Sequence, residues 1–550
     1  MRIHGLPDDI LRIVLRKSLH RGSDKLEAFK SNLVWLSVCQ RWRGLAIPMV
    51  YSNLYVQFGE RIVRKFGADS RDRSGEEPTD AAIKTNLDLI SAVGCTSMAR
   101  SADIAVGFTI NPIPGFRKVA ERLRIVSSEW KRITTLNVFV FPDTSNSSIH
   151  RVDVSGYSDH ISEVSDVVAA LMPDVCQLNW KGSNYSRIAN ALHGELARRY
   201  YKTLEEIDSM YPIVAPSGRR FERLKKLNIC NSIVSDNQYP NVNAGELEKL
   251  TLRNVPSDHS WASFSSNNDG SVIEFAKLNN LTLAYNSVYK EEDNVVQHRD
   301  GHPWTLQLPA LGNLSITCYV NICPLFEYMV LPPRMRTIFI GMPLEAYQRI
   351  AHVALATAES IVLKVNYISQ YSPSGFAAIN RILESARGSD EVGLDITDSG
   401  SPILPEFITC TALTRLCITA STNVDTMLGF FQHLPNLTKL VVHNLMLDDI
   451  QSDLSIPDAS SHTPVEPLDT KLNILAINYN KNQYSPDMAV AVAKYMLLKV
   501  PMLAQFNVAQ IPRQPIVDFV ETFAQWYPHL SNDWIKVYEG REYSGLRWML

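Results

Sequence analysis

Apolar and polar positions repeat in the same order along most of this chain. An amphipathic run at helical spacing is followed by a short break, often at proline, and then by a strand of the form Leu-x-x-Leu-x-Leu. The clearest example is the apolar run at 427–431, which leads through Pro435 into Leu437-x-x-Leu440-x-Val442. Neither element can bury its apolar face alone, so the pattern predicts units that stack on one another.

The strand pattern recurs along the chain, and helical runs at 167–172 and 492–498 precede two of its copies. The further segments that carry it are 133–138, 175–180, 224–229, 247–252, 278–283, 311–316, 413–418, 472–477 and 503–508. The intervals from Leu227 to Leu250 and from Leu416 to Leu440 are the short ones. Both lie within the roughly 20–29 residues typical of leucine-rich repeats.

Other repeats are longer, because the intervals from Leu250 to Leu281 and from Leu281 to Leu314 exceed that typical length. The extra length falls in polar stretches, which predicts loop insertions rather than further core elements. We expect these insertions at about 66–82, 254–272, 285–305 and 451–470.

The pattern predicts an α/β fold. Residues 51–550 are expected to form a curved leucine-rich-repeat solenoid with a parallel inner sheet and outer helices, because stacking the units buries one continuous core. The alternative is a doubly wound sheet, whose strands would be more uniformly rich in Val and Ile and would not keep the leucines in register.

Residues 1–50 are expected to form a separate small module of three helices. Apolar residues at helical spacing, with Pro7 in the first turn and Asp8 and Asp9 at the positive end, predict the first helix. After a polar break at 20–25, an apolar run at 33–38 leads into Trp42, and Pro48 predicts the end of that helix. A short strand is expected at 54–56.

This N-terminal stretch is similar to a known motif. Leu6-Pro7-x-x-Ile10-Leu11-x-x-Val14, followed by Val38-Cys39-Gln40-Arg41-Trp42-Arg43-x-x-Ala46, resembles the F-box. The match covers about a tenth of the chain, and the segment 15–34 is longer and more polar than the usual link between the two halves. With the irregular repeats that follow, the chain resembles fungal-type F-box proteins with C-terminal leucine-rich repeats.

The resemblance implies a function and a set of contacts. F-box proteins dock on the Skp-type adaptor of a Skp–cullin–F-box ubiquitin ligase, and through it on a cullin, while the repeats hold a protein substrate. The positions that match the motif would be the adaptor-binding residues: Leu6, Pro7, Ile10, Leu11, Val14, Val38, Trp42 and Arg43. In the alternative interpretation, the protein is an interaction scaffold that belongs to no ligase. Its N-terminal helices then only cap the solenoid, and these side chains lie in a hydrophobic core.

The substrate would meet the exposed x positions of the strands. Examples are Lys225, Lys226, Thr251, Thr282, Thr438 and Lys439, which are mixed in charge and indicate no single class of ligand.

Composition narrows the classes of partner and the compartment. The formal net charge is -3, which argues against a nucleic-acid partner. No apolar run approaches the roughly 20 residues that span a bilayer, so no membrane partner is expected. Asp8 and Asp9 stand where a signal peptide would be apolar, and the eight cysteines are scattered singly. Both observations favour an intracellular protein, in the cytoplasm or the nucleus.

Candidate chemistry is sparse. The pairs Cys318 with Cys323 and Cys410 with Cys417 do not have the Cys-x-x-Cys spacing of a zinc site and are expected to be small buried side chains. His298 and His302, beside the acidic 291–293, are expected in a solvated loop. Phosphate-loop, dinucleotide and hydrolase motifs are absent from the sequence. We therefore expect no catalytic residue, no metal and no cofactor, with an enzyme as the remaining alternative.

Overall fold

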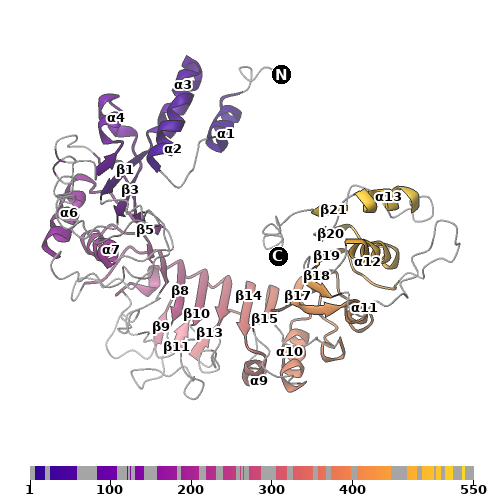
Figure 1. Ribbon diagram of the computed structural model, residues 1–550. Helices are drawn as coiled ribbons and strands as arrows, with labels where there is room; N and C mark the ends of the chain where they lie inside the picture. The colour runs from indigo at the N-terminus through magenta and orange to yellow at the C-terminus, as the bar shows by residue number, and fades with distance from the viewer. Residues whose placement is uncertain are drawn as a thin grey trace, which may run out of the picture. The chain divides into compact units, whose positions relative to one another are not determined.

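The structure of the chain is a computed structural model. It describes residues 7–18, 25–58, 83–107, 121, 124, 130–141, 158–181, 187–209, 219–230, 240–255, 261, 264, 272–285, 305–318, 326, 328–350, 357–366, 373–397, 405–446, 468–479, 486–500, 503–509, 514–523 and 535–538. The chain divides into two compact units, Met1–Arg253 with Ser260–Ala276 and Asn254–His259 with Lys277–Leu550. Both units are mixed α/β with parallel sheets, which is the predicted fold class (Figure 1).

The first unit contains a sheet whose neighbouring strands are parallel, with one exception. In spatial order its parallel strands are β1 (Asn53–Phe58), β3 (Ser101–Gly107), β4 (Thr135–Phe141), β5 (Gln177–Lys181), β6 (Glu206–Ser209), β7 (Lys226–Cys230) and β8 (Lys249–Val255). The exception is β2 (Ile83–Thr85), which pairs antiparallel with β1. A further short strand is β9 (Val272–Glu274).

Helices precede and interrupt this sheet. They are α1 (Asp8–Ser18), α2 (Lys25–Asn32), the 3-10 helix η2 (Leu33–Ser37), α3 (Gln40–Val50), α4 (Leu87–Ala92), η4 (Thr96–Met98), α6 (Ser158–Leu171), α7 (Arg187–Arg199) and η7 (Ala244–Glu246). Helix α7 packs against α6 on one side and against β4 and β5 on the other. The apolar face of α7 is therefore buried against α6 and the sheet.

The second unit repeats this arrangement. Its parallel strands are β10 (Asn280–Tyr285), β12 (Asn313–Thr317), β14 (Arg334–Met342), β15 (Thr357–Val365), β16 (Glu391–Ile396), β17 (Arg415–Asn423), β18 (Lys439–Met446), β19 (Ile474–Tyr479), β20 (Gln505–Ala509) and β21 (Ile535–Tyr538). Apart from this sheet, β11 (Thr305–Gln307) pairs in parallel with β13 (Met329–Val330).

The helices of the second unit lie between consecutive strands in the chain. They are η9 (Leu344–Ala346), α9 (Tyr347–Ile350), α10 (Pro373–Ser385), η10 (Pro405–Phe407), α11 (Val424–His433), α12 (Pro486–Lys499) and α13 (Gln514–Phe523). Figure 1 shows α10, α11 and α12 on one side of the strands that they connect. The predicted helical runs at 167–172, 427–431 and 492–498 are confirmed within α6, α11 and α12.

The leucine pattern also predicted the strand register correctly. Leu227 pairs with Leu250, Leu281 with Leu314, and Leu416 with Leu440. These six side chains are buried, as are the leucines that open each pattern just before a strand: Leu224, Leu247, Leu278, Leu311, Leu413 and Leu472. The leucines of the Leu-x-x-Leu-x-Leu pattern therefore form the core on one side of the sheet.

The sequence interpretation missed several strands, including β3 and β6 of the first unit and three consecutive strands of the second. Strands β14, β15 and β16 carry Ile, Val and Met where the pattern has Leu, so a search for Leu-x-x-Leu-x-Leu passes over them. Their core positions are nevertheless buried, as at Ile338, Ile361 and Val392. An aliphatic residue of similar volume fills the same place in the stack.

The N-terminal helices differ from the expected boundaries. The expected helix from 33 onwards is broken, because Leu33–Ser37 is a 3-10 helix and α3 starts only at Gln40. Pro48 lies inside α3, which continues to Val50. A proline in the last turn removes one hydrogen bond without blocking the residues after it, and Tyr51 N still donates to Ile47 O at 3.0 Å.

The predicted insertions lie outside the described residues for the most part. All of 66–82 is outside them, and the other three are described only at Asn254 and Val255, Trp261, Phe264, Val272, Tyr285, Thr305 and 468–470. Asn254 has a φ of 52°, a left-handed conformation that asparagine tolerates better than most residues. This residue lies where the chain is about to leave β8.

Candidate functional site

The N-terminal helices form a small core of their own. Leu11 and Leu15 lie on one stripe of α1 and are fully buried, and Trp42 and Ala46 lie on one stripe of α3 and are buried as well. Helix α1 packs on α3, and η2 packs on both α2 and α3. The rings of Trp35 and Trp42 stack at 5.7 Å between their centroids. The module predicted as three helices therefore has three α-helices, with η2 as an added turn.

Polar contacts fix how α3 starts. The backbone of Cys39 is extended, and its sulfur accepts a hydrogen bond from Trp42 N at 3.5 Å, which caps the helix. Arg43 Nε donates to Leu36 O at 2.7 Å and ties η2 to α3. The break at Val38 and Cys39 therefore results from capping chemistry, which an apolar periodicity does not reveal.

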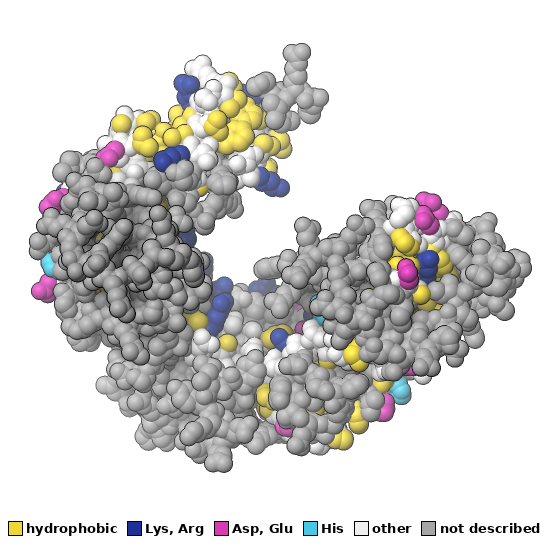
Figure 2. All heavy atoms as spheres, in the orientation of Figure 1, with side chains coloured by type: hydrophobic (Ala, Val, Ile, Leu, Met, Phe, Trp, Pro, Cys, Tyr) yellow, Lys and Arg dark blue, Asp and Glu magenta, His cyan; other side chains and the backbone are white. Residues whose placement is uncertain are grey.

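Among the described residues of this module, four large apolar side chains face solvent. Their exposed fractions are 43% for Ile10 and 50% for Ile13 on α1, 60% for Val34 in η2, and 46% for Val38 before α3. We call them the apolar patch. Figure 2 shows apolar side chains gathered on the surface of the N-terminal helices. Because the module already has a packed core, its folding does not depend on burying these four side chains.

The structure separates the eight predicted adaptor-binding residues. Ile10, Val38 and Pro7 are exposed, Val14 is half-buried, and Arg43 is exposed with its Nε engaged by Leu36. Leu11 and Trp42 are buried in the module, so they support a surface and do not form one. Leu6 lies outside the described residues.

The sequence interpretation missed Ile13 and Val34. A signal for Ile13 was present, because Ile10 and Ile13 are three residues apart and form a second apolar stripe beside Leu11 and Leu15. Val34 was counted in a helix that the structure does not form.

The module joins the first strand of the sheet through a short, ordered connection. Val50 and Tyr51 are buried, and the Tyr51 ring meets Phe29 edge-on at 5.8 Å. Ser52 O accepts a hydrogen bond from Arg100 N at 2.7 Å directly before β1 begins. Burial raises the pKa of the Tyr51 hydroxyl. These contacts hold the end of α3 against the sheet.

A second candidate surface is the face of the first sheet opposite the leucines. We call it the polar face: the described side chains that alternate with core residues along β1 and β3 to β8. Asp103 on β3 is buried and accepts hydrogen bonds from Asn53 at 2.8 Å and from Asn137 at 2.6 Å. Asn179 donates to Asn137 at 3.1 Å, and Lys181 Nζ lies 3.5 Å from Asp103. These contacts run across four neighbouring strands.

The same row continues on β6 to β8 in register. Asp208 pairs with Asn228 and Asn228 with Thr251 along the sheet, and Asn228 donates to Asp208 at 2.9 Å. Burial raises the pKa of Asp208, which nearby Arg253 partly counteracts. Lys226 Nζ lies 3.2 Å from Glu206.

The corresponding face of the second unit is largely closed. Cys417, Val441, Ala476 and Asn507 stand at these positions on β17 to β20, and each is less than a tenth exposed. Arg415 is buried there too, with Nη2 3.2 Å from Asp395 and Nη1 3.3 Å from Glu391. This part of the face offers a ligand little surface.

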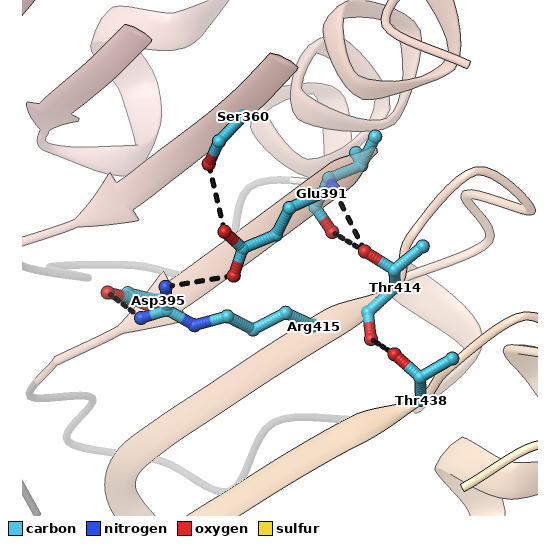
Figure 3. A network of polar contacts seen from close by, with 7 residues as sticks. Ser360, Glu391, Asp395, Thr414, Arg415 and Thr438 are labelled. Carbon is cyan, nitrogen blue, oxygen red and sulfur yellow. Dashed lines mark hydrogen bonds and ion pairs between the residues drawn. The ribbon is translucent and has the colours of Figure 1, made fainter. Parts of the chain in front are cut away.

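Figure 3 shows the network around Arg415. Its guanidinium lies between the two carboxylates, and Ser360 donates to Glu391 at 2.9 Å from the neighbouring strand. Thr438 donates to Thr414 O at 2.9 Å, and these two residues directly precede β18 and β17. The network links four adjacent strands and is a structural tie between them.

The predicted x positions differ in exposure. Lys226 and Thr438 are exposed, while Lys225, Thr282 and Lys439 are half-buried. Thr251 is only 4% exposed, so its prediction as an exposed contact residue was wrong. Its neighbours Asn228 and Arg253 flank it on the same face, and a short hydroxyl side chain lies below them.

The described residues contain no group of His, Cys, Asp and Glu arranged to hold a metal ion. Cys318, Cys410 and Cys417 are buried, as predicted, and burial raises the pKa of the Cys410 and Cys417 thiols to about 12. Cys323, His298 and His302 lie outside the described residues. Within the described ranges, no helix has the length and apolarity needed to cross a bilayer.

Comparison with known proteins assigns no family. No protein-family model matches the sequence, and no curated protein matches it either.

Proposed function

We propose that this chain is the substrate-recognition subunit of a Skp–cullin–F-box ubiquitin ligase. The N-terminal module docks on a Skp-type adaptor, and through it on a cullin, while the sheet-bearing units hold a protein substrate. The observation that carries this proposal is the apolar patch, Ile10, Ile13, Val34 and Val38, on a module whose core is already complete.

The patch has the chemistry of a docking surface. Apolar side chains gathered on the surface of the N-terminal helices, as in Figure 2, are typical of protein–protein contacts. Burying four half-exposed aliphatic side chains stabilises a complex by on the order of 4 kcal/mol. The rest of the affinity would come from backbone and polar contacts at the rim, where Arg43 and Asp8 are exposed.

For the remainder of the chain we propose a leucine-rich-repeat solenoid. In support, matching leucines of neighbouring strands pair directly, although the length of chain between them differs from pair to pair. The pairs are Leu227 with Leu250, Leu416 with Leu440 and Leu281 with Leu314. Units of unequal length with one shared register are typical of stacked repeats. The doubly wound alternative needs helices on both faces of one sheet.

The proposed mechanism is proximity, without bond-making by this chain. The module is fixed to the ligase, and the substrate is held where an acceptor lysine meets the charged ubiquitin carrier. The raised local concentration of the acceptor lysine and its restricted orientation together accelerate the transfer of ubiquitin. The short connection at Val50 to Asn53 suits this role, because it limits how the bound substrate moves relative to the ligase. The proposal places the protein in the cytoplasm or the nucleus.

A second candidate is an interaction scaffold outside any ligase, whose N-terminal helices act only as a cap. Burial of Leu11 and Trp42 favours it, because those side chains serve the module's own core. The two candidates differ in the apolar patch, which a cap does not use.

The test replaces two patch residues in the full chain, Ile10→Asp with Val38→Asp, and measures binding to a purified Skp-type adaptor by calorimetry. We expect micromolar or tighter binding by the wild-type chain and a loss of at least about tenfold in the variant, since each buried charge costs more than about 1 kcal/mol. Both side chains are exposed, so circular dichroism should be unchanged.

The matched control is Val330→Asp on β13, which introduces the same charge at another exposed valine. It should bind the adaptor as the wild type does. Failure of the wild-type chain to bind at micromolar concentration would remove the ligase proposal and leave the scaffold.

A further inference from the structure

We infer that the polar face of the first unit binds an acidic, extended segment of the protein substrate. The cations Lys181, Lys226, Lys249 and Arg253 would contact its carboxylates. This inference rests on the proposed function in one respect only, that the segment belongs to a substrate of the ligase. Binding of an acidic segment to this face is testable without the adaptor.

The part of the polar face that a ligand can reach lies on β5–β8, because most side chains of the other strands are buried. The core side of the sheet is packed with leucines, and on the polar face Tyr55, Asp103 and Asn137 of β1, β3 and β4 are nearly fully buried. On β5 to β8, in contrast, most side chains of the polar face are half-buried or exposed. A ligand that reaches this sheet therefore meets these four strands.

The most exposed charges of the polar face have one sign. The exposed side chains among its described residues are Lys181, Lys226, Lys249 and Arg253, and all four are cations. Figure 2 shows Lys and Arg side chains together near β8. An approaching molecule therefore meets positive charge first.

The carboxylates of the polar face are recessed and engaged. Asp103 is buried beneath bonds from Asn53 and Asn137. Asp208 accepts from Asn228, and Glu206 is paired with Lys226. Each carboxylate is thus engaged within the sheet by a hydrogen bond or an ion pair. Four cations stand against these three carboxylates, so the described residues of the face keep a net positive charge that attracts an anion.

Two of the cations form no close ion pair, although both act on the Asp208 carboxylate at longer range and favour its charged form. Lys249 and Arg253 make no ion pair with any described residue within 4.0 Å, and both are exposed on the same face of β8. They are four positions apart along the strand, which corresponds to about 13 Å. Lys226 stands beside Lys249 in register on β7, about 4.8 Å away at the backbone.

This spacing selects an extended chain. Acidic residues four positions apart in an extended peptide are also about 13 Å apart and lie on one side of it, because side chains alternate with period two. A segment lying along β8 would place one carboxylate at Lys249 and Lys226 and the next at Arg253. The guanidinium of Arg253 can hold a carboxylate through two parallel hydrogen bonds.

A peptide fits this face better than a nucleic acid does. A continuous phosphate backbone would pass over Glu206 and Asp208, which lie between the cations of β5 and those of β7 and β8. The exposed members of the face include no aromatic ring on which a base could stack, within the described residues. Spaced carboxylates can meet the cations and avoid both acids.

The test uses the full chain and a labelled Gly/Ser peptide that carries two Asp residues four positions apart. Its affinity is measured by fluorescence anisotropy at low and physiological salt. We expect binding that weakens as salt increases, and a loss of about tenfold in the variant Lys249→Glu with Arg253→Glu, because two attractions become repulsions. The matched control is Lys131→Glu with Lys202→Glu, which changes net charge equally at exposed sites outside the sheet face and should bind as the wild type does.

Three outcomes would overturn the inference. One is equal peptide affinity for wild type and the β8 variant. Another is equal affinity for a peptide with the two Asp residues adjacent, which would remove the spacing argument. The third is tighter binding of a single-stranded oligonucleotide than of the peptide at the same residues. The variant Ile10→Asp with Val38→Asp should keep peptide binding, and the β8 variant should keep adaptor binding, so failure of one proposal is distinct from failure of the other.

Discussion

Arg41 on α3 donates two hydrogen bonds to one carboxylate oxygen of Asp8 on α1, from Nη2 at 2.6 Å and from Nε at 2.9 Å. The two residues are far apart in the chain, so this contact sets the position of α1 against the start of α3. Ile10 follows Asp8 by half a turn, and Val38 lies just before α3. The pair therefore aligns two members of the apolar patch.

Asp8→Asn and Arg41→Gln should each weaken adaptor binding about threefold while changing the free energy of unfolding by less than about 1 kcal/mol. Both side chains are roughly half exposed, and exposed ion pairs contribute little to stability. Because the two act through one contact, the double variant should lose no more affinity than either single variant. Calorimetric titration with the adaptor measures all three.

The control for this cycle is Arg12→Gln. Arg12 pairs with Asp9 within α1 at 3.9 Å, and that pair does not join two helices. Adaptor affinity should stay at the wild-type value. Additive losses in the Asp8 and Arg41 double variant would show that the two residues contact the adaptor independently.

His193 on α7 should make the first unit sensitive to acid. It is fully buried with its ring edge-on to Trp180, and burial lowers its pKa from 6.5 to about 3, partly opposed by the backbone of Asp208. The unfolded chain therefore takes up a proton at a higher pH than the folded chain does. Stability is fully present above pH 6.5 and is lost as the pH falls towards 3, by about 2 kcal/mol between pH 7 and pH 5.

The variant His193→Gln should lose this component, because glutamine is neutral throughout. Urea-unfolding midpoints at pH 7 and pH 5 measure the difference, which should be smaller in the variant than in the wild type. His160→Gln on α6, at a partly exposed position, serves as the control. An unchanged difference for His193→Gln would place the acid sensitivity in other groups.

Arg415→Met should destabilise the second unit by about 3 kcal/mol at pH 7, because it leaves the largely buried carboxylate of Asp395 without its cation. It also removes the ion-pair partner of Glu391, which is 40% exposed. Burial already raises the pKa of Asp395, and Arg415 counteracts this. In the variant that pKa rises further, so the deficit should shrink as the pH is lowered to 5 and Asp395 takes up a proton.

Denaturant unfolding at both pH values tests this. Arg387→Met is the matched control, since Arg387 pairs with Glu384 at an exposed site and its loss should cost less than about 1 kcal/mol. A deficit for Arg415→Met that is the same at pH 7 and pH 5 would rule out Asp395 as its cause.

Most of the core was readable from the sequence, because aliphatic spacing alone decides which side of a strand is buried. Leu227, Leu250 and Leu416 were placed correctly together with their register. Strands β14 to β16 were missed because residues such as Ile338 and Ile340 take the place of leucines there. The physical requirement is volume and apolarity, and the residue name is only a proxy for both.

The candidate site was less readable, for a geometric reason. Helix α1 carries two adjacent apolar stripes, Leu11 with Leu15 and Ile10 with Ile13, and periodicity alone does not say which one faces the module's core. The choice depends on how α3 packs against α1, which is a tertiary contact. The exposure of Lys249 and the burial of Thr251, two positions along one strand, likewise depend on neighbouring side chains.

The pairing of leucines across repeats of unequal length has a consequence for how such a chain changes over time. The sheet contacts between Leu281 and Leu314 are of the same kind as those between Leu416 and Leu440, although the chain between the first two is longer than the chain between the second two. The scaffold therefore places little constraint on what lies between two strands. Segments there can be lengthened, shortened or exchanged one at a time while the framework keeps its alignment, so the chain can acquire new loops without first losing its fold.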